Sequence, residues 1–152
     1  MKLIRATATE AAGMAQAHAG AFADSWREED FEDLLEGDGV FGFLAVDDED
    51  RPLGVILSRI AAGEMEVLTV GVRPEARRLG VAKALMTAAL GVARQAGAEA
   101  CFLEVAVDND GAGALYAGLG FRRAGLRKRY YDRGAEGMID ALVMRLDLNT
   151  PA

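Results

Sequence analysis

The stretch TVGVRPEARRLGVAKALMTAAL, residues 69–90, decides the fold, because in it a β-strand leads into a helix through an unusual junction. The alternating β-formers stop at Pro74, which has no N–H with which to continue a ladder of hydrogen bonds. The first turn of the following helix has free backbone N–H groups and the positive end of the helix dipole. Together these features predict an anion site, suited above all to phosphate.

The side chains around this junction favour the same interpretation. Gly80 and Ala82 carry little side chain, so a diphosphate can touch the backbone there. The cations that surround the junction are Arg73, Arg77, Arg78 and Lys83. The pattern GxxxxGK[ST] is absent and GxGxxG does not occur at this junction, so neither P-loop nor Rossmann binding is indicated here. The alternative is a basic helix start that holds no ligand.

Hydrophobic periodicity predicts strands and helices on both sides of the junction. Thr7 with Glu10, and Ser25 with Glu28, form capping-box patterns that open two helices, the first reaching about Phe22. We expect strands over residues 3–5, 40–46, 53–60, 64–72, 100–107, 120–131 and 138–146.

Two further helices follow the junction. The first runs from about Arg78 to Ala96 and ends at Gly97, a C-cap candidate. A short helix comes after the apolar strand ACFLEVAV and is capped by one of three neighbouring residues, Asp108, Asn109 or Asp110. The order β-α-α-β-β-β-α-β-α-β-β predicts an α/β fold. We expect one mixed sheet of about seven strands, a central βαβ crossover and helices on both faces.

The length and composition of the chain exclude several classes of protein. The 152 residues suit one domain, residues 1–152, and 51% of them are hydrophobic. No apolar stretch is long enough for a membrane span, and the start of the chain lacks the apolar core of a signal peptide. The single cysteine, Cys101, excludes a disulfide framework and a multi-cysteine zinc site. These features favour a soluble, cytoplasmic protein with no metal.

Charge is unevenly distributed along the chain. The net charge of −7 argues against direct nucleic-acid binding. Acidic side chains gather in residues 24–50, and basic ones in residues 122–133. Most such runs are solvated faces, but this asymmetry also suggests an acidic rim that attracts a cationic substrate.

The sequence resembles the GNAT family of acetyl-CoA-dependent N-acetyltransferases. The hexapeptide Arg77-Arg78-Leu79-Gly80-Val81-Ala82 fits the family signature [RQ]-x-x-G-x-[GA]. The resemblance narrows to the RimI-type ribosomal-protein-alanine N-acetyltransferases and covers almost the whole chain. It is carried by LEVAVDNDGAGALYAGLGF (103–121), RKRYYDRGAEGMIDALVMRLDL (127–148) and HAGAFADSWREEDFEDLL (18–35). Ala106 and Asp108 stand where that group often has Arg and Ser, which bears on substrate contact.

The resemblance implies acetyl-CoA as co-substrate. The residues implied to bind it are Val70, Gly71, Val72, Arg77, Arg78, Leu79, Gly80, Val81, Ala82, Lys83 and Asn109. The strand Val70–Val72 would pair its backbone with the pantetheine arm, and one amide would polarise the thioester carbonyl. Gly71 would allow a close approach, although a glycine in a strand can also mark a bulge.

Two residues are candidates for the chemistry. Glu104 is flanked by apolar neighbours along its strand, and a carboxylate buried there would hold a proton more readily, which suits a base. Its alternative role is an ion pair with an arginine of a neighbouring element. Tyr116 can protonate the departing thiolate, or can simply pack in the core. The resemblance implies that Glu104 is the general base and Tyr116 the general acid.

The acceptor is less constrained. The resemblance implies the N-terminal alanine of a basic small-subunit ribosomal protein, with Trp26, Tyr130 and Tyr131 binding it. Tyr130 and Tyr131 can equally be aromatics of an edge strand. The alternatives are a small amine or a lysine side chain as acceptor, or a silent acyl-CoA-binding module. We expect a monomer or weak dimer that binds no membrane.

The remaining candidates point away from chemistry. His18, on an Ala-rich helix, is expected to pack. Ser25 and Ser58 lie in no GxSxG elbow. Cys101 is three residues from Glu104, hence on the opposite strand face, and is expected in the core. This favours direct transfer without an acetyl-cysteine intermediate.

Overall fold

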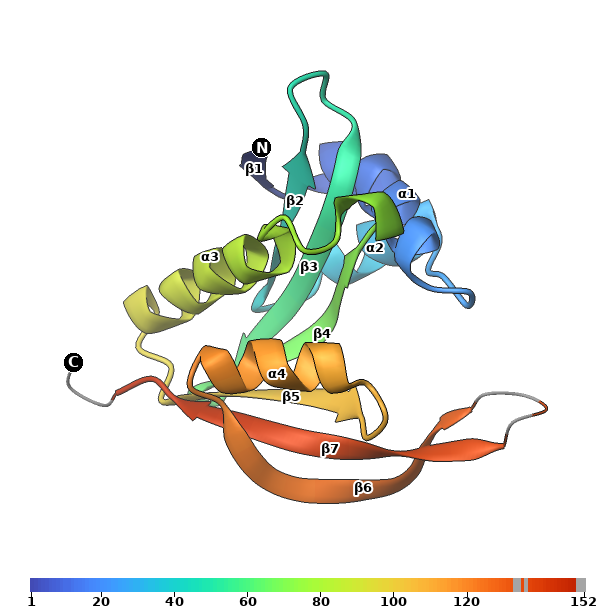
Figure 1. The fold of residues 1–152 in the computed structure, drawn as a ribbon. Helices are drawn as coiled ribbons and strands as arrows, with labels where there is room; N and C mark the ends of the chain where they lie inside the picture. The colour runs from blue at the N-terminus through green and yellow to red at the C-terminus, as the bar shows by residue number, and fades with distance from the viewer. Residues whose placement is uncertain (133–134, 136, 150–152) are drawn as a thin grey trace.

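The structure, a computed structural model, describes residues 1–132, 135 and 137–149 (Figure 1). Within these residues, seven strands form one mixed sheet in the order β1-β2-β3-β4-β5-β7-β6. The strands are β1 (Lys2–Arg5), β2 (Val40–Val46), β3 (Pro52–Ala61), β4 (Glu64–Val72), β5 (Ala100–Ala106), β6 (Arg122–Asp132) and β7 (Met138–Asp147). The helices are the 3₁₀ turns η1 (Ala8–Glu10) and η2 (Pro74–Ala76) with α1 (Ala11–Ala21), α2 (Glu28–Leu35), α3 (Val81–Gln95) and α4 (Asp110–Gly118).

The predicted order of elements is confirmed. The hairpin of β2 and β3 pairs antiparallel, as do β3 and β4. The β4-α3-β5 unit is the expected crossover, because β4 and β5 pair in parallel. Thr7 and Glu10 form the predicted capping box at η1, and Gly97 adopts a left-handed φ of 80° just after α3.

Two predicted helix starts are wrong. The α2 helix begins at Glu28 with Arg27 as N-cap, not at Ser25, because the Asp30 carboxylate accepts a hydrogen bond from the Arg27 N–H at 2.8 Å. The α3 helix begins at Val81 rather than near Arg78. Arg78 and Gly80 have φ values of 63° and 81°, which a right-handed helix cannot contain.

Strands β4 and β5 separate soon after they meet. Their pairing covers only Glu64–Glu66 against Ala100–Phe102, and beyond it the strands diverge (Figure 1). On its other edge β4 stays paired with β3 up to Val72, with a register shift near Leu57. In the described part of the chain, residues 67–72 of β4 therefore have no strand partner on the β5 side. Their outward backbone groups are available to a ligand.

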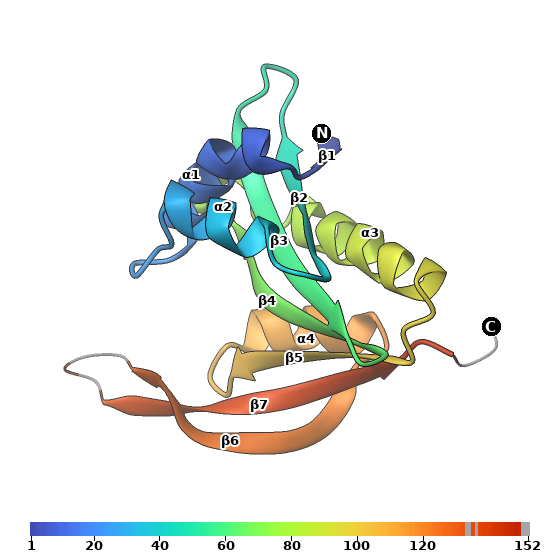
Figure 2. The ribbon, with the colours of Figure 1, turned by 180° about the vertical axis from the view of Figure 1, so that it is seen from behind.

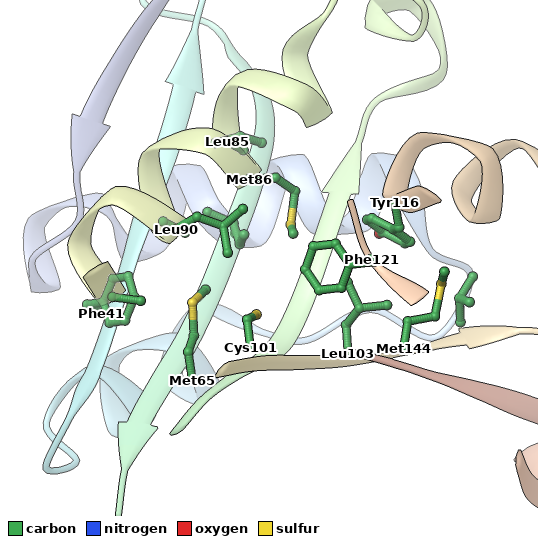
Figure 3. Packing of buried hydrophobic residues seen from close by; sticks show 14 of the residues in the cluster. Phe41, Met65, Leu85, Met86, Leu90, Cys101, Leu103, Tyr116, Phe121 and Met144 are labelled. Atoms are coloured by element: carbon green, nitrogen blue, oxygen red, sulfur yellow. The ribbon is translucent and has the colours of Figure 1, made fainter. Parts of the chain in front are cut away.

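The sheet buries apolar side chains on both faces. One core cluster joins α3 and α4 to the sheet and includes Met86, Leu103 and Phe121 (Figure 3). The second packs α1 and α2 on the other face around Met14 and Phe31. Helices thus cover both faces, as predicted. No helix of the described residues is long and apolar enough to span a membrane.

One face of β5, by contrast, is not covered by any helix of the described residues. Phe102, Glu104 and Ala106 alternate with the buried residues of β5 and are only half-buried. Seen from behind, β5, β7 and β6 lie in front of α4, and no helix stands before them (Figure 2). We call this surface of β5, β7 and β6 the open face. The Glu104 side chain lies on this face and is 25% exposed.

Ser58 generates a prediction about stability. Its side chain is fully buried in β3, and its hydroxyl has no hydrogen-bond partner among the residues that the structure describes. Because a buried hydroxyl without a partner is costly, we expect Ser58→Ala to raise the free energy of unfolding by about 1 kcal/mol. Urea unfolding measures this change. Ser25→Ala is the control and should change the stability little, and a destabilised Ser58→Ala would contradict the prediction.

Candidate active site

The junction between β4 and α3 has the geometry of an anion site. After η2 the chain passes through the left-handed residues Arg78 and Gly80 into α3. Gly80 is the N-cap and has no side chain to accept from the first turn. The Ala84 N–H bonds to the Gly80 carbonyl at 3.0 Å, so the earlier N–H groups of the helix are those left without an intrahelical acceptor. They can bind the oxygens of a phosphate.

Cations surround this helix start. Arg78 and Lys83 are exposed, and neither forms an ion pair within the described part of the chain. Arg77 donates from Nε to the Val72 carbonyl oxygen at 3.3 Å, which ties the junction to the end of β4. All three can balance the charge of a bound anion.

The prediction that Arg73 joins these cations is wrong. Its Nη1 donates to the Pro52 carbonyl oxygen at 3.4 Å, and its Nε lies 3.6 Å from Glu75 Oε1. Its side chain also covers Gly20 of α1, where a Cβ would lie 2.9 Å from the Arg73 Cγ. Arg73 therefore fastens α1 and β3 to the end of β4.

Two glycines of the predicted site serve different purposes. A Cβ on Gly80 would meet nothing within 4 Å, so this position opens into free space beside the exposed Leu79. A Cβ on Gly71 would lie 2.7 Å from Phe22 and 2.8 Å from Ala21. Gly71 is thus required by the packing of α1, and the register shift of β4 falls elsewhere, near Leu57.

The remaining coenzyme candidates lie close to these features. Val70 and Val72 belong to the unpaired edge of β4, while Val81 is buried at the start of α3 with Ala82 beside it. Asn109 caps α4, because its Oδ1 accepts from the Ala112 N–H at 3.2 Å. This settles which of the three predicted residues is the cap. A role of Asn109 in coenzyme binding stays a prediction.

Glu104 lies on the open face in a charged surrounding. The expectation of an apolar environment is wrong, because Arg127 of β6 places Nη1 2.5 Å from Glu104 Oε1. The Glu104 side chain is 25% exposed and that of Arg127 is 56% exposed. The sequence analysis considered an ion pair between Glu104 and an arginine. It could not identify Arg127 as the partner, because β6 contains several arginines.

Tyr130 and Tyr131 surround the same carboxylate. Their rings meet edge to face with centroids 5.0 Å apart. Tyr131 donates from its hydroxyl to the Glu104 backbone oxygen at 3.2 Å. Partial burial, and then a hydrogen bond to the Glu104 side chain, raise the pKa of Tyr130. The structure thus brings both tyrosines to Glu104, as a site requires.

Tyr116 is buried on the other side of β5. It projects from α4 into the core beside Phe121, with ring centroids 6.0 Å apart (Figure 3). Burial, with a smaller contribution from Tyr131, raises its pKa to about 12. The hydroxyl therefore stays protonated at every pH where the protein works, as a general acid must.

Trp26 belongs to an aromatic cluster at the end of α1. It stacks on His18, with ring centroids 5.1 Å apart, and also contacts Phe31. With Asp30, Asp33 and Leu34 it lines a shallow surface depression of about 410 Å³. This depression is acidic and lies on α2, not at Glu104. That Trp26 binds an acceptor stays a prediction.

His18 packs, as predicted, and carries two hydrogen bonds. The Trp26 N–H donates to Nδ1 at 3.0 Å, and Nε2 lies 3.1 Å from the Thr69 Oγ1. The ring is 3% exposed, and burial lowers its pKa to about 4 despite the nearby Asp24. Cys101 is equally buried in the core, and burial raises the pKa of its thiol to about 12. Neither group is available for chemistry.

The described residues contain no cluster of three or more His, Cys, Asp or Glu side chains that could hold a metal ion. They do contain the unpaired edge of β4, which begins at the cationic start of α3. This edge leads toward β5, where the Glu104 carboxylate lies on one face of the strand and the Tyr116 phenol on the other. This arrangement suits the transfer of a group from a long, phosphorylated carrier.

Comparison with known proteins identifies the class. Residues 11–121 match the Acetyltransferase (GNAT) family, so the chain belongs to that family of acetyltransferases. The fold and the class predicted from the junction are therefore confirmed.

Three relatives show which members of the family this chain is similar to. The N-alpha-acetyltransferase RimI of Mycobacterium tuberculosis is 41% identical over 96 residues, which cover 63% of this chain and 57% of that protein. The crystal structure of the ribosomal-protein-S18-alanine N-acetyltransferase from Escherichia coli has a TM-score of 0.88 at 24% identity, covering 99% of this chain and 96% of that one. Arabidopsis thaliana NAA60 in complex with acetyl-CoA has a TM-score of 0.85 at 18% identity, covering 98% and 99%. The predicted resemblance to the RimI type is thus confirmed.

The helix start generates a prediction about ligand binding. We expect acetyl-CoA to raise the Tm of the wild-type protein, and ATP or NADH to raise it far less. Gly80→Glu should abolish this protection, because its side chain would enter the open space and add negative charge where a diphosphate would bind. Differential scanning fluorimetry measures both effects.

Gly63→Glu is a matched control. Gly63 has nearly the same φ, 79°, and a Cβ there would also meet nothing within 4 Å, so the two variants carry similar backbone strain. Gly63 lies in the β3–β4 turn, at the opposite end of β4 from the junction. Its variant should keep the protection. Protection retained in Gly80→Glu, or equal protection by ATP, would contradict a coenzyme site at the junction.

Proposed function

We propose that this protein transfers the acetyl group of acetyl-CoA to the N-terminal alanine of a basic small-subunit ribosomal protein. The observation that carries the proposal is the unpaired edge of β4, which connects the free N–H groups of α3 to the neighbourhood of Glu104 and Tyr116. The name of the M. tuberculosis relative supports an α-amino group as acceptor, and that of an E. coli relative, a ribosomal protein bS18-alanine N-acetyltransferase, supports the alanine of a ribosomal protein. Because ribosomal proteins are made in the cytoplasm, we propose that this protein acts there.

The coenzyme would bind along the junction. Its diphosphate would accept hydrogen bonds from the first turn of α3, with Arg77, Arg78 and Lys83 balancing the charge. Its pantetheine arm would extend the sheet at the β4 edge, where the backbone of Val70–Val72 has hydrogen-bonding capacity to spare. One β4 amide would polarise the thioester carbonyl. Asn109, at the start of α4, would contact the arm from the other side.

Glu104 and Tyr116 would divide the proton transfers. The acceptor arrives as an ammonium ion and must lose one proton to Glu104 before its lone pair can attack the thioester carbon. The tetrahedral intermediate then expels the coenzyme as a thiolate when the C–S bond breaks. Tyr116 gives that thiolate its phenolic proton. The nitrogen loses its second proton as the intermediate collapses, and that proton restores the Tyr116 phenol, while Glu104 releases the first proton to solvent. Because Cys101 is buried and kept as a thiol, the transfer is direct.

The acceptor would approach over the open face. The α1–α2 loop and the end of β6 that leads toward β7 lie on the same side of the molecule (Figures 1 and 2). Trp26 belongs to that loop and Tyr130 to that end of β6. The acidic helix α2 adjoins that loop, and its Asp and Glu side chains would attract basic residues that follow the acceptor's first alanine. We further propose that residues 1–152 act as one domain, as a monomer or weak dimer.

The acceptor can be tested directly. We expect acetylation of a basic peptide that begins with a free alanine, and no acetylation of the same peptide with a blocked N-terminus. The measurement is mass spectrometry of a panel that also contains internal lysines, spermidine and other small amines. Transfer only to lysines or only to small amines would replace the proposed acceptor. Coenzyme binding without transfer to any of these would indicate a silent acyl-CoA-binding module.

The division of labour predicts two distinct pH–rate profiles. Glu104→Gln keeps the shape of the side chain but cannot take a proton, so kcat/KM should fall about 10²–10⁴-fold near neutral pH. The loss should shrink at high pH, where the amine loses its proton unaided. Glu49→Gln is the control, because Glu49 also pairs with an arginine, Arg51, but lies in the turn between β2 and β3, away from β5 and the proposed chemistry.

Tyr116→Phe should lower kcat while leaving the affinity for acetyl-CoA nearly intact. Since the phenol of Tyr116 has a pKa of about 12, its ionisation should not reduce wild-type activity near pH 10, where an unperturbed tyrosine would titrate. Full kcat in Tyr116→Phe across the profile would show that Tyr116 only packs. Thermal unfolding of each variant checks that the fold is kept.

A further inference from the structure

The Glu104–Arg127 pair crosses the open face. Glu104 lies on β5 and Arg127 on β6, with β7 between them. Arg127 pairs in register with Ala141 of β7, which in turn pairs with Ala106 of β5. Ala141 is fully buried although no helix of the described residues covers this surface, which is consistent with the Arg127 side chain passing over it. The guanidinium thus reaches the carboxylate from two strands away.

The surroundings of the guanidinium form a site for a cation. Besides Glu104 Oε1 at 2.5 Å, the Tyr130 ring lies beneath it, with Arg127 Cζ 4.2 Å from the ring centroid. Tyr131 holds the Glu104 backbone oxygen through its hydroxyl, at 3.2 Å. A carboxylate beside an aromatic face binds a guanidinium or an ammonium by the same two attractions.

We infer that Arg127 occupies the place of the acceptor's α-ammonium group and competes with the acceptor for Glu104. This inference rests on the proposed function. In the absence of an acceptor, Arg127 neutralises the carboxylate and covers the Tyr130 ring. An incoming ammonium displaces the guanidinium and takes over both contacts, which places its proton against Glu104.

The energetics allow this exchange. The Arg127 side chain is 56% exposed, so it can move into water without breaking a packed core. Exposed ion pairs contribute little free energy, because water and salt screen them and because ordering a long side chain costs entropy. Arg127 is therefore a selectivity filter: an acceptor must offer a cation that binds the site better than a tethered guanidinium does.

The test compares acceptor binding in three variants. Arg127→Gln removes the competing charge, so the KM for a basic peptide with an N-terminal alanine should fall between about 1.5-fold and 5-fold. The KM for acetyl-CoA should stay the same. Arg127→Lys restores a cation and should move the acceptor KM back toward the wild-type value. Arg122 lies on β6 like Arg127 and forms a similar exposed pair with Asp147 of β7, so Arg122→Gln should leave the acceptor KM unchanged.

A second readout tests occupancy itself. Low millimolar guanidinium chloride should inhibit Arg127→Gln competitively against the acceptor, because the vacated place accepts a free guanidinium. It should inhibit the wild-type protein far less, and equal concentrations of sodium chloride should have little effect on either. A role confined to holding the fold would not produce this pattern.

Failure of the inference about Arg127 and failure of the proposed function would give different results. If Arg127→Gln raises the acceptor KM, or lowers kcat with no fall in KM, Arg127 orients Glu104 and does not compete with the acceptor. If the wild-type protein acetylates a small amine and no peptide, the proposed function fails. The same variants, measured with that amine, then still decide the role of Arg127. If no transfer occurs at all, calorimetric Kd values for the peptide, and inhibition of its binding by guanidinium, decide it.

Discussion

The short pairing of β4 with β5 is the constraint on which the rest of the structure depends. After three residue pairs the strands separate, and one edge of β4 is left with backbone groups that have no partner strand. A sheet normally satisfies such groups, because exposing them in its middle is costly. The separation persists because each strand has its own support: β4 is held by β3, and β5 by β7. The opening in the sheet can therefore exist before any ligand fills it.

The surrounding elements complete that opening. Arg77 bonds the Val72 carbonyl and so fixes the cationic helix start at the upper end of the β4 edge. Gly71 lets α1 pack closely against the opposite face of β4, so the strand is supported from behind. On β5 the alternation of the strand places Leu103 in the core and Glu104 on the open face. A carrier bound along β4 would thus meet the carboxylate where the two strands diverge.

The sequence was sufficient for most of the fold and less so for the site. Periodicity located every strand to within about two residues, and the junction motif located the cationic start of a helix, because both depend on local residue patterns. The start of α3 was missed because the left-handed backbone of Arg78, a non-glycine residue, leaves no signal in composition. The ion pair of Glu104 was left open because it depends on which of several arginines of β6 lies opposite β5 across β7. That choice is set by the register of strands distant in sequence, which no local pattern records.

The hydrogen bonds of His18 have a mechanical consequence. The Trp26 N–H donates to Nδ1, so the ring's own hydrogen lies on Nε2 and is donated to Thr69 on β4. One imidazole thereby joins the loop beside the open face to the strand that would carry the coenzyme. Because burial keeps the ring neutral down to about pH 4, this link holds under all ordinary conditions. A single buried side chain therefore ties the position of the loop to the position of β4.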